Sequence, residues 1–274
     1  MWTPRTPQTY LERWDLRVDG HAVTTPSSTI VPVLSEGRRA MLKVARIEEE
    51  GRGCRLLAWW NGRGAARVFE ADDHAAVMER AAGGSLRQVS RGDDEAATLT
   101  LCDIAQTLHG ASAIMAPPGG LTPLREWFGA LYARAESHPD EKRGFWTQAA
   151  EIADRLLADD GQEVVLHGDL HHDNVLNFGE GRWKAIDPKN VVGHRLFDYT
   201  SLLFNPTAHS AETHFARRIA TICHATSASP SAVLEWTLTS AALSAAWFAG
   251  EERTAESARL LRIARLAARG LETA

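Results

Sequence analysis

The most informative segment of the chain is Val164-Val165-Leu166-His167-Gly168-Asp169-Leu170-His171-His172-Asp173-Asn174-Val175-Leu176. Apolar residues lead into it and out of it, which predicts two short strands joined by a polar loop. Within the loop, Asp169 and Asn174 lie five positions apart. A carboxylate and an amide held in one loop between strands are suited to chemistry on oxygen atoms, so this loop is the first candidate for a catalytic site.

After the loop the chain returns to a further carboxylate. Glycines in the stretch 178–183 predict a turn, and a strand over 183–186 then leads to Asp187. Phosphoryl transfer needs one carboxylate that orients the acceptor hydroxyl and hard oxygen ligands that hold Mg²⁺. The order His167, Asp169, Asn174, Asp187 matches the kinase pattern H-x-D-x-x-x-x-N followed by a later Asp. The pattern predicts Asp169 as the catalytic base and Asn174 and Asp187 as Mg²⁺ ligands.

Two other interpretations of the loop remain open. Asp and Asn are common turn residues, although this accounts for single positions better than for the whole set. The three histidines 167, 171 and 172 could bind zinc, but they lie on a loop and no HExxH motif is present. We expect His167 to support the loop from below and His171 or His172 to face the acceptor. Asp173 is expected to be a solvated loop carboxylate.

A lysine inside an apolar strand is the second notable feature. Lys43 stands in Met41-Leu42-Lys43-Val44-Ala45, and a buried ammonium is costly unless it has a partner. Phosphate oxygens and one of the acids 48–50 would supply that partner, although a lysine that protects an edge strand is the alternative. No glycine-rich phosphate loop of the GxGxxG or GxxxxGK[ST] type occurs. Hydroxyl and N–H groups of the segment 25–29 would take its place.

Working outward from these motifs, the chain divides into a β-rich first part and a helical second part. Residues 1–10 are expected to form a loose tail. Strands are expected at 14–18, 29–34, 40–44, 66–70 and 75–79, with one helix at 48–60. Helices are expected at 93–109, 122–137, 142–158 and from 197 onward, with short strands at 164–166, 175–178 and 183–186. This order predicts an α+β, two-lobed fold: a small antiparallel β N-lobe with one helix over 11–82 and a larger, mostly helical C-lobe over 83–274.

Composition excludes several classes of protein. The chain has 274 residues, of which 44% are hydrophobic and 24% charged, as in an ordinary globular protein. The net charge of −5 argues against a nucleic-acid partner. The three cysteines are far apart and form no CxxC pair, which favours reduced thiols. Without a secretory signal or a long apolar run, we expect a cytoplasmic protein that does not cross a membrane, monomeric by default.

These motifs resemble the aminoglycoside phosphotransferase and choline-kinase-like families, which have the protein-kinase fold and an HGDxxxxN catalytic loop. In more detail, the chain resembles the streptomycin 6-phosphotransferases of the aminoglycoside/hydroxyurea antibiotic resistance kinase family. The resemblance extends from about residue 12 to about residue 270. The segments that carry it are Met41–Arg46, Trp59–Phe69, Met78–Ala81, His167–His172, Asp187-Pro188, Phe197–Tyr199 and Leu243–Phe248.

The resemblance implies ATP and Mg²⁺ as cofactors. Lys43 would contact the α- and β-phosphates and pair with Glu50, and the segment 78–81 would be the hinge that offers backbone groups to adenine. The expected nucleotide contacts are Lys43, Glu50, Ser27, Ser28, Glu79 and Ala81. Two positions depart from the family pattern. Asp173 stands where the family often has Glu, and Lys189-Asn190 follow Asp187-Pro188 where related enzymes tend to have His-Gly.

The resemblance also implies a cationic acceptor. Streptomycin carries two guanidinium groups, which bind carboxylates and flat aromatic rings. The expected substrate contacts are His171, Asp198, Trp247, Glu251 and Glu252. Alternatively, Trp247 is part of the core, the two glutamates begin the next helix, and Asp198 braces the catalytic loop through backbone hydrogen bonds.

The function expected from the sequence is ATP-dependent phosphorylation of the 6-hydroxyl of the streptidine ring of streptomycin, which would inactivate the antibiotic. Two alternatives are a kinase of another small hydroxylated compound, such as hydroxyurea or an amino sugar, and a nucleotide-binding module without catalysis. The intact set of Lys43, Asp169, Asn174 and Asp187 argues against the second of these.

Overall fold

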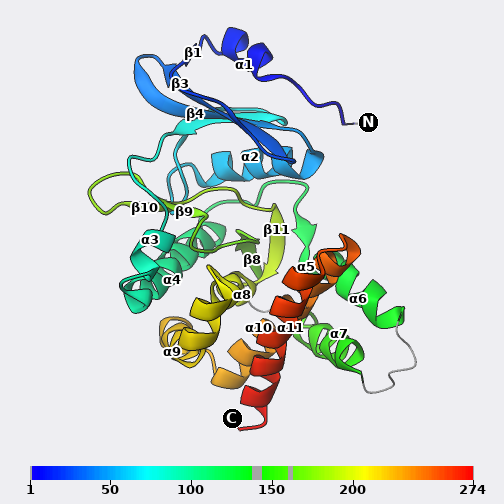
Figure 1. Ribbon diagram of the computed structural model, residues 1–274. Helices are drawn as coiled ribbons and strands as arrows, with labels where there is room; N and C mark the ends of the chain where they lie inside the picture. Colours follow the sequence, from blue (N-terminus) through cyan, green and yellow to red (C-terminus); the bar gives the residue numbers. More distant parts are fainter. Residues whose placement is uncertain (1, 138–143, 160–162, 274) are drawn as a thin grey trace.

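The computed structural model describes residues 2–137, 144–159 and 163–273, which form a β-rich lobe above a helical lobe (Figure 1). This confirms the α+β, two-lobed fold. The N-lobe sheet has the strand order β1-β3-β4-β6-β5, with β2 paired to β3, and every pairing is antiparallel. Its strands are β1 (Arg17–Val18), β2 (Val23–Thr24), β3 (Ser28–Ser35), β4 (Arg38–Ala45), β5 (Val68–Ala71) and β6 (Ala75–Glu79).

Lys43 lies in the middle of this sheet. Its strand β4 is paired on one side to β3, where Ile30 is opposite Lys43, and on the other side to β6, where Ala76 is opposite. The neighbours Leu42 and Val44 are fully buried. The alternative of an edge-strand lysine is therefore wrong, and the ammonium of Lys43 needs partners inside the protein.

The helix α2 (Glu48–Trp60) has the bounds that the sequence predicts. Its two glycines weaken helix propensity but permit two close contacts. A Cβ atom on Gly51 would lie 2.1 Å from the backbone oxygen of Asp73, and one on Gly53 would lie 2.5 Å from the backbone oxygen of Pro188. The helix is therefore packed between the β5–β6 turn and the loop after Asp187, with no room for a side chain at either contact.

The N-terminal segment is not a loose tail as a whole. Residues Pro7–Arg13 form α1, with Pro7 at a position of the first turn where a missing N–H costs nothing. The ring of Tyr10 is fully buried, and its hydroxyl donates to Asp72 at 2.9 Å. Burial of the Tyr10 ring explains why the helix forms. The strand expected at 14–18 is shorter than predicted and covers only Arg17–Val18.

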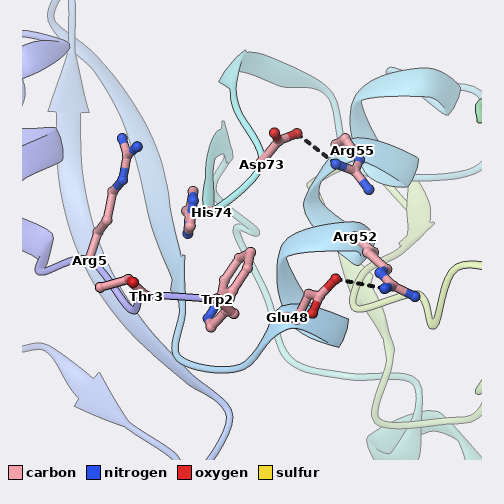
Figure 2. A pocket seen from close by; sticks show the side chains of 8 residues that line it. All are labelled: Trp2, Thr3, Arg5, Glu48, Arg52, Arg55, Asp73 and His74. Atoms are coloured by element: carbon pink, nitrogen blue, oxygen red, sulfur yellow. Dashed lines mark hydrogen bonds and ion pairs between the residues drawn. The ribbon is translucent and has the colours of Figure 1, made fainter. Parts of the chain in front are cut away.

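The first residues, α2 and the β5–β6 turn line a cavity of about 580 Å³ (Figure 2). The ring of Trp2 is stacked on His74 with 4.0 Å between the ring centroids. Two arginines of α2 in this cavity are already paired, Arg52 with Glu48 at 2.6 Å and Arg55 with Asp73 at 2.7 Å. The remaining lining residues are Thr3 and Arg5.

The C-lobe is mostly helical and is built around α10, which packs against α11, α8, α7 and α6. Its helices are α3 (Arg87–Ser90), α4 (Asp94–Gly110), α5 (Leu124–Trp127), α6 (Gly129–Glu136), α7 (Phe145–Leu156), α8 (Phe197–Phe204), α9 (Ala208–Thr226), α10 (Pro230–Gly250) and α11 (Thr254–Leu271), with a short 3-10 turn at Ala111–Ala113. Asp93 caps α4 by accepting from the N–H of Ala96. The expected helix at 122–137 is instead a short strand followed by α5 and α6, and residues 142–143 of the next one lie outside the described part of the chain.

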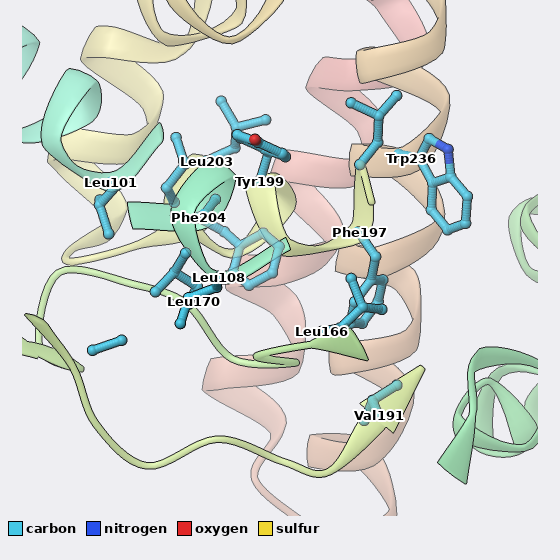
Figure 3. Close-up of a cluster of buried hydrophobic side chains, with 14 of the residues drawn as sticks. Leu101, Leu108, Leu166, Leu170, Val191, Phe197, Tyr199, Leu203, Phe204 and Trp236 are labelled. Atoms are coloured by element: carbon cyan, nitrogen blue, oxygen red, sulfur yellow. The ribbon is translucent and has the colours of Figure 1, made fainter. Parts of the chain in front are cut away.

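The core of this lobe reaches up to the polar loop (Figure 3). Leu166, Leu170 and Val191 are fully buried beside the aromatic residues Phe197 and Trp236. Leu170 lies within the candidate catalytic loop, so apolar burial fixes the loop from below. Within the ranges described, no helix combines the length and apolar character that a membrane span requires.

Short strands place the two functional loops side by side. They are β7 (Thr122–Pro123), β8 (Glu163–Leu166), β9 (Val175–Asn177), β10 (Trp183–Ala185) and β11 (Val191–His194). β9 and β10 form the predicted hairpin, and β11, which the sequence analysis missed, pairs with β8 so that Val191 is opposite Leu166. Because β8 leads into one loop and β11 follows the other, the Lys189 N–H donates to the His167 oxygen at 2.7 Å.

Backbone hydrogen bonds also join the lobes. Ala65 of the N-lobe forms a bridge with Ala185 of β10, whereas the bridge of Ser85 with Leu176 of β9 lies within the C-lobe. The N–H of Ala66 donates to the Ala185 oxygen at 2.9 Å, and the N–H of Ala185 donates to the Gly64 oxygen at 2.8 Å. The hairpin between the two loops is thus fastened to the N-lobe.

Candidate active site

The catalytic loop is held by Asp198, the second residue of α8. This carboxylate is buried and accepts the N–H of His167 at 2.9 Å, the N–H of Gly168 at 2.8 Å and His109 Nε2 at 2.8 Å. Burial would raise the pKa of Asp198, but His109, His167 and the backbone donor outweigh burial and lower it. Asp198 is therefore not a substrate contact as predicted. It carries its charge beneath the loop, where it satisfies two N–H groups.

The three loop histidines have separate roles. His167 is buried, with Nε2 2.8 Å from the Ile186 oxygen, and burial lowers its pKa, so it supports the loop as expected. His172 is also buried, and burial lowers its pKa to about 3. Of the two predicted acceptor-facing histidines, only His171 lines the cavity beside Asp169 that is described below. Since the rings point to different surroundings, and no three His, Cys, Asp or Glu side chains among the described residues are grouped to hold a metal, the zinc alternative has no support.

His171 lies beside the predicted catalytic base. Its Nε2 is 3.6 Å from Oδ2 of Asp169. Burial alone would lower the pKa of His171, but the carboxylates of Asp169, Asp173 and Asp187 together raise it. The expected solvated carboxylate, Asp173, is 40% exposed and pairs with Arg87 at 3.1 Å.

Asn174 orients Asp169. Its Nδ2 donates to the Asp169 backbone oxygen at 2.9 Å and to the Asp169 Oδ2 at 3.3 Å. The donor side of the amide is thus turned toward Asp169, which leaves its oxygen for another partner. The N–H of Ile186 donates to the Asn174 backbone oxygen at 2.9 Å, which ties the strand before Asp187 to the catalytic loop.

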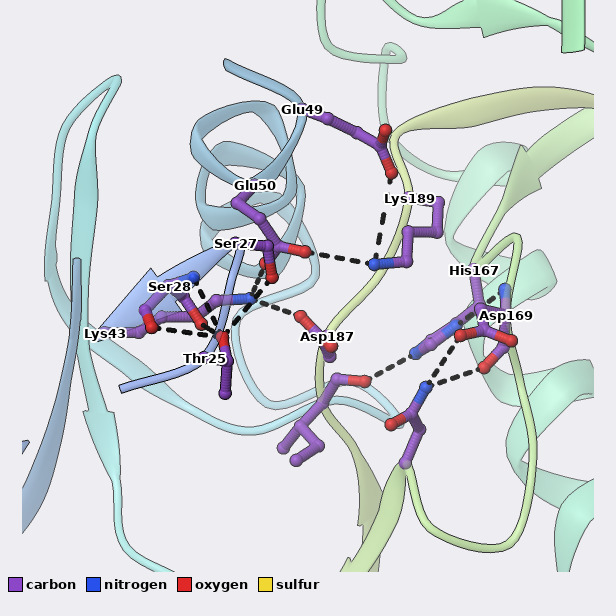
Figure 4. Close-up of polar contacts among 12 residues, drawn as sticks. Thr25, Ser27, Ser28, Lys43, Glu49, Glu50, His167, Asp169, Asp187 and Lys189 are labelled. Atoms are coloured by element: carbon purple, nitrogen blue, oxygen red, sulfur yellow. Dashed lines mark hydrogen bonds and ion pairs between the residues drawn. The ribbon is translucent and has the colours of Figure 1, made fainter. Parts of the chain in front are cut away.

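A chain of charges connects the N-lobe with the second loop (Figure 4). The ammonium of Lys43 is buried and forms ion pairs with both Glu50 and Asp187. Lys189 Nζ lies 3.1 Å from Glu50 Oε1 and 4.0 Å from Glu49 Oε1. Of the three acids that open α2, the expected Glu50 is thus the one that meets Lys43.

The pKa directions follow from these contacts. Burial would lower the pKa of Lys43, but Asp187 and the other acidic groups nearby raise it. Burial would raise the pKa of Asp187, but Lys43 and Lys189 lower it. Both groups are charged at neutral pH, so the pair is ionic and is stabilised by its surroundings.

The donor set fits a divalent cation. Mg²⁺ is usually held by one or two protein carboxylates together with phosphate oxygens and water, so it does not need a cage of three acids. Asp187 supplies a deprotonated carboxylate and Asn174 an amide oxygen, on two loops joined through Ile186. Asp187 has φ +65°, and this sparsely populated conformation is held by the contacts on both sides of it.

The residues expected near the nucleotide are divided. Ser27 lines the large cavity described below. Ser28 is buried at the start of β3, where its hydroxyl and its N–H are both hydrogen-bonded to the hydroxyl of Thr25. The side chain of Glu79 is occupied, since it pairs with Lys184 and accepts the N–H of Arg67. Across the described ranges, the backbone of Ala81 has no hydrogen-bond partner, as a hinge that binds adenine requires.

A cavity of about 680 Å³ opens beside Asp169 and His171. Along α10, lining residues recur every three or four positions, at Ser240, Ser244 and Trp247, which places them on one face of the helix. The other lining residues include Ser27, Glu49, Trp127, Gly168, Lys189, Phe197, Thr200, Ser201, Phe204, Asn205, Phe248, Glu251, Arg253, Arg259 and Leu260.

Two tryptophans form a corner of this cavity. The rings of Trp127 and Trp247 are 5.3 Å apart at 79°. Trp247 and Glu251 line the cavity as predicted, but Glu252 is exposed and does not line it, because the chain turns there with φ +60°. Trp127 was missed, since it comes from a separate helix and has no polar motif around it.

The comparisons with known proteins agree with this geometry. The profile of the aminoglycoside/hydroxyurea antibiotic resistance kinase family matches residues 13–252. A streptomycin 3''-kinase of Klebsiella pneumoniae is 43% identical over 250 residues, which cover 88% of this chain and 91% of that protein. A streptomycin 6-kinase of Streptomyces griseus is 33% identical over 219 residues, which cover 76% of this chain and 69% of that protein.

Solved structures share the fold at low sequence identity. The aminoglycoside phosphotransferase APH(4)-Ia superposes with a TM-score of 0.66 at 14% identity, over 96% of this chain and 97% of that one. Since the family profile covers most of the sequence and the streptomycin 3''-kinase matches nearly all of it, the chain belongs to the aminoglycoside/hydroxyurea antibiotic resistance kinase family.

Proposed function

We propose that this protein is an ATP- and Mg²⁺-dependent kinase that phosphorylates a hydroxyl group of streptomycin. The observation that carries the proposal is that Asp169, held by Asn174, lines a cavity of about 680 Å³ that the Trp127–Trp247 corner also lines. One side of the catalytic loop thus meets the Lys43 ion pairs, and the other side meets a space large enough for a multi-ring acceptor. Because the reaction needs ATP, we infer that the enzyme works in the cytoplasm.

In the proposed reaction, Asp169 accepts a hydrogen bond from the acceptor hydroxyl and orients its oxygen toward the γ-phosphorus. Lys43 binds the α- and β-phosphates, and Glu50 keeps the ammonium in place. Asn174 and Asp187 would hold Mg²⁺, which when bound neutralises phosphate charge. Most of the acceleration then comes from positioning and from charge stabilisation in a fixed site.

The acceptor end of the cavity supports a cationic substrate. A guanidinium group is attracted to the face of an indole ring, and it pairs with carboxylates in fixed geometry. Trp127 and Trp247 provide two such rings, and Glu251 lies one turn beyond Trp247. We propose these three residues, with His171 next to the reacting hydroxyl, as the acceptor contacts.

For the position of phosphorylation, we propose the 3''-hydroxyl first. The sequence analysis predicted the 6-hydroxyl, and the relatives include proteins named for each position. The support for 3'' is the 43% identity to the streptomycin 3''-kinase over 250 residues, against 33% over 219 residues for the streptomycin 6-kinase. The 6-hydroxyl is the second candidate, because a relative named for it also covers most of the chain.

The test is ADP release with Mg-ATP and four acceptors: streptomycin, free streptidine, hydroxyurea and glucosamine. Streptidine carries the 6-hydroxyl but lacks the 3'' ring, so a 3''-kinase leaves it unmodified whereas a 6-kinase has its acceptor ring available. Phosphorus–proton correlation spectroscopy of the streptomycin product then identifies the modified carbon. If streptomycin does not raise ADP release above the rate with water alone, the proposed substrate is wrong, and a response to hydroxyurea only would favour the small-acceptor alternative.

A further inference from the structure

The mechanism above leaves Lys189 without a role. It follows Asp187 by two positions, within Lys189-Asn190, one of the two departures from the family pattern that the sequence analysis names. Its N–H donates to the His167 oxygen at 2.7 Å. A Cβ atom on Gly168 would lie 2.9 Å from the Cβ of Lys189, so the lysine backbone packs directly on the catalytic loop beside Asp169. The backbone of Lys189 is therefore fixed in place between Asp169 and Asp187, the two carboxylates predicted to act in the reaction.

The side chain of Lys189 faces the cavity that Asp169 lines. It is 19% exposed, whereas Lys43 is 6% exposed and lies behind Asp187. Among the described residues that line this cavity, Lys189 is the only lysine. Arg253 and Arg259 also line it, but they belong to the segment around α11 and are distant in sequence from the catalytic loop. Lys43 pairs with Asp187 and shares Glu50 with Lys189, so both ammonium groups lie near Asp187.

The partners of Lys189 leave it able to move. Its Nζ is 3.1 Å from Glu50, which already forms an ion pair with Lys43, and 4.0 Å from Glu49. Glu50 is therefore shared between two cations, and Glu49 is at the outer limit of an ion pair. A lysine has a long flexible stem, so a stronger anion within reach can replace these contacts.

On these grounds we propose that Lys189 is a catalytic residue that contacts the transferred phosphoryl group from the acceptor side. The inference rests on the proposed kinase function. In the reaction, a bond forms between the acceptor oxygen and the γ-phosphorus, and the bond from that phosphorus to the bridging oxygen of ADP breaks. The hydroxyl proton passes to Asp169 and then to solvent. Lys189 keeps its own protons and stabilises charge on the phosphoryl oxygens as they move between ADP and the acceptor.

The decisive variant is Lys189→Met, which removes the charge and keeps the length of the side chain. We expect kcat to fall about 100-fold, the order seen when one preorganised charge-stabilising donor is removed. The dissociation constant of Mg-ADP should change less than about threefold, whereas that of a non-hydrolysable Mg-ATP analogue should rise about tenfold, since only the analogue has a γ-phosphoryl group. Calorimetric titration measures both constants without turnover, and Lys189→Arg should recover part of kcat.

The matched control is Lys184→Met. Lys184 has a side chain 17% exposed and is also paired with a glutamate, but it lies on β10 and does not line the cavity. Its kcat should equal that of the wild type. Slow hydrolysis of ATP by water, measured without acceptor, tests Lys189 even if streptomycin is not the substrate.

Equal loss of ADP and ATP-analogue affinity in Lys189→Met would overturn the proposal, because it would mean that Lys189 only holds α2 through Glu50. Unchanged kcat in a folded variant would overturn it as well. If Lys189→Met does not fold, Lys189→Gln gives the same comparison.

Discussion

The two ends of the active-site cavity are built from different interactions. At the phosphate-facing end, Lys43, Glu50, Asp187 and Lys189 form a continuous set of ion pairs that spans both lobes. At the acceptor end, the wall includes the Trp127–Trp247 corner and helix hydroxyls, with the charged side chains of Glu251, Arg253 and Arg259 beside them. Phosphoryl transfer depends on the precise position of the reacting groups, which a network of ion pairs can fix, whereas aromatic faces attract a cation without a fixed hydrogen-bond direction. On the proposed function, substitutions at the first end should change mainly kcat, and those at the second end mainly the KM for the acceptor.

The largest expected effect is a loss of kcat on substitution of Asp169, which lies between the two ends of the cavity. Asp169→Asn keeps the shape of the side chain but removes the group that accepts the hydroxyl proton, so kcat should fall about 1,000-fold. Mg-nucleotide affinity, measured by calorimetry, should stay within about threefold of the wild type, because Asp169 is not assigned to the phosphates. Retention of full ADP release by the variant would refute the assignment of Asp169.

The second prediction disturbs the phosphate-facing end without removing a charge. In Gly53→Ala, the new Cβ would lie 2.5 Å from the Pro188 backbone oxygen. Either α2 or the loop after Asp187 must move, so we expect the free energy of unfolding to fall by about 2 kcal/mol and the KM for ATP to rise. The control is Gly110→Ala, where a Cβ meets nothing within 4 Å. It should stabilise the protein by about 0.5 kcal/mol in urea denaturation, and an equal loss in both variants would contradict the contact argument.

At the acceptor end, Trp247→Ala removes one face of the aromatic corner. We expect the KM for streptomycin to rise about tenfold, equivalent to about 1.4 kcal/mol, while the KM for ATP stays unchanged. Trp146→Ala, which removes a tryptophan of α7 outside the cavity lining, is the control and should leave both values alone. A parallel rise in both KM values would mean that Trp247 supports the fold rather than the acceptor.

The smallest effect concerns pH. The pKa of His171 is raised in the folded protein, so its stabilising contribution is complete below the unfolded value of about 6.5 and is lost as pH rises through the folded pKa. The difference in unfolding free energy between the wild type and His171→Asn should therefore shrink as pH rises above about 6.5. Urea denaturation of both proteins across this range measures it, and a difference that grows with pH would show that the nearby carboxylates do not control this ring.

Much of the fold could be predicted where local patterns were strong. The helix at 48–60 has the bounds expected, and the hairpin before Asp187 forms as expected. The errors lie where tertiary contacts, and not the local sequence, determine the secondary structure. Residues Pro7–Arg13 become helical because Tyr10 finds a buried site, and Val191–His194 becomes a strand by pairing with β8, a contact distant in sequence.

In the site, the sequence predicted the groups whose order forms a motif, and the structure brings Lys43, Glu50 and Asp187 together. The sequence could not show which side of the catalytic loop Asp198 occupies, because an aspartate that is buried beneath a loop and an aspartate that binds a ligand are the same residue type. Trp127 carried no signal at all. Lys189 did carry one, as a departure from the family pattern, but its meaning depended on contacts with Glu50 and Gly168.

The close contact between Gly53 and Pro188 has a consequence for how the chain folds during synthesis. The helix α2 is surrounded only when a loop from late in the sequence has arrived, and the same is true of Ala65, which bridges to Ala185. Such distant contacts form late, after the chain segments between them have been made. The N-lobe therefore leaves the ribosome with one side of its helix and one loop uncovered. The segment around Asp187 covers both when it arrives, whereas Asp198 and the α10 residues of the cavity are made later still.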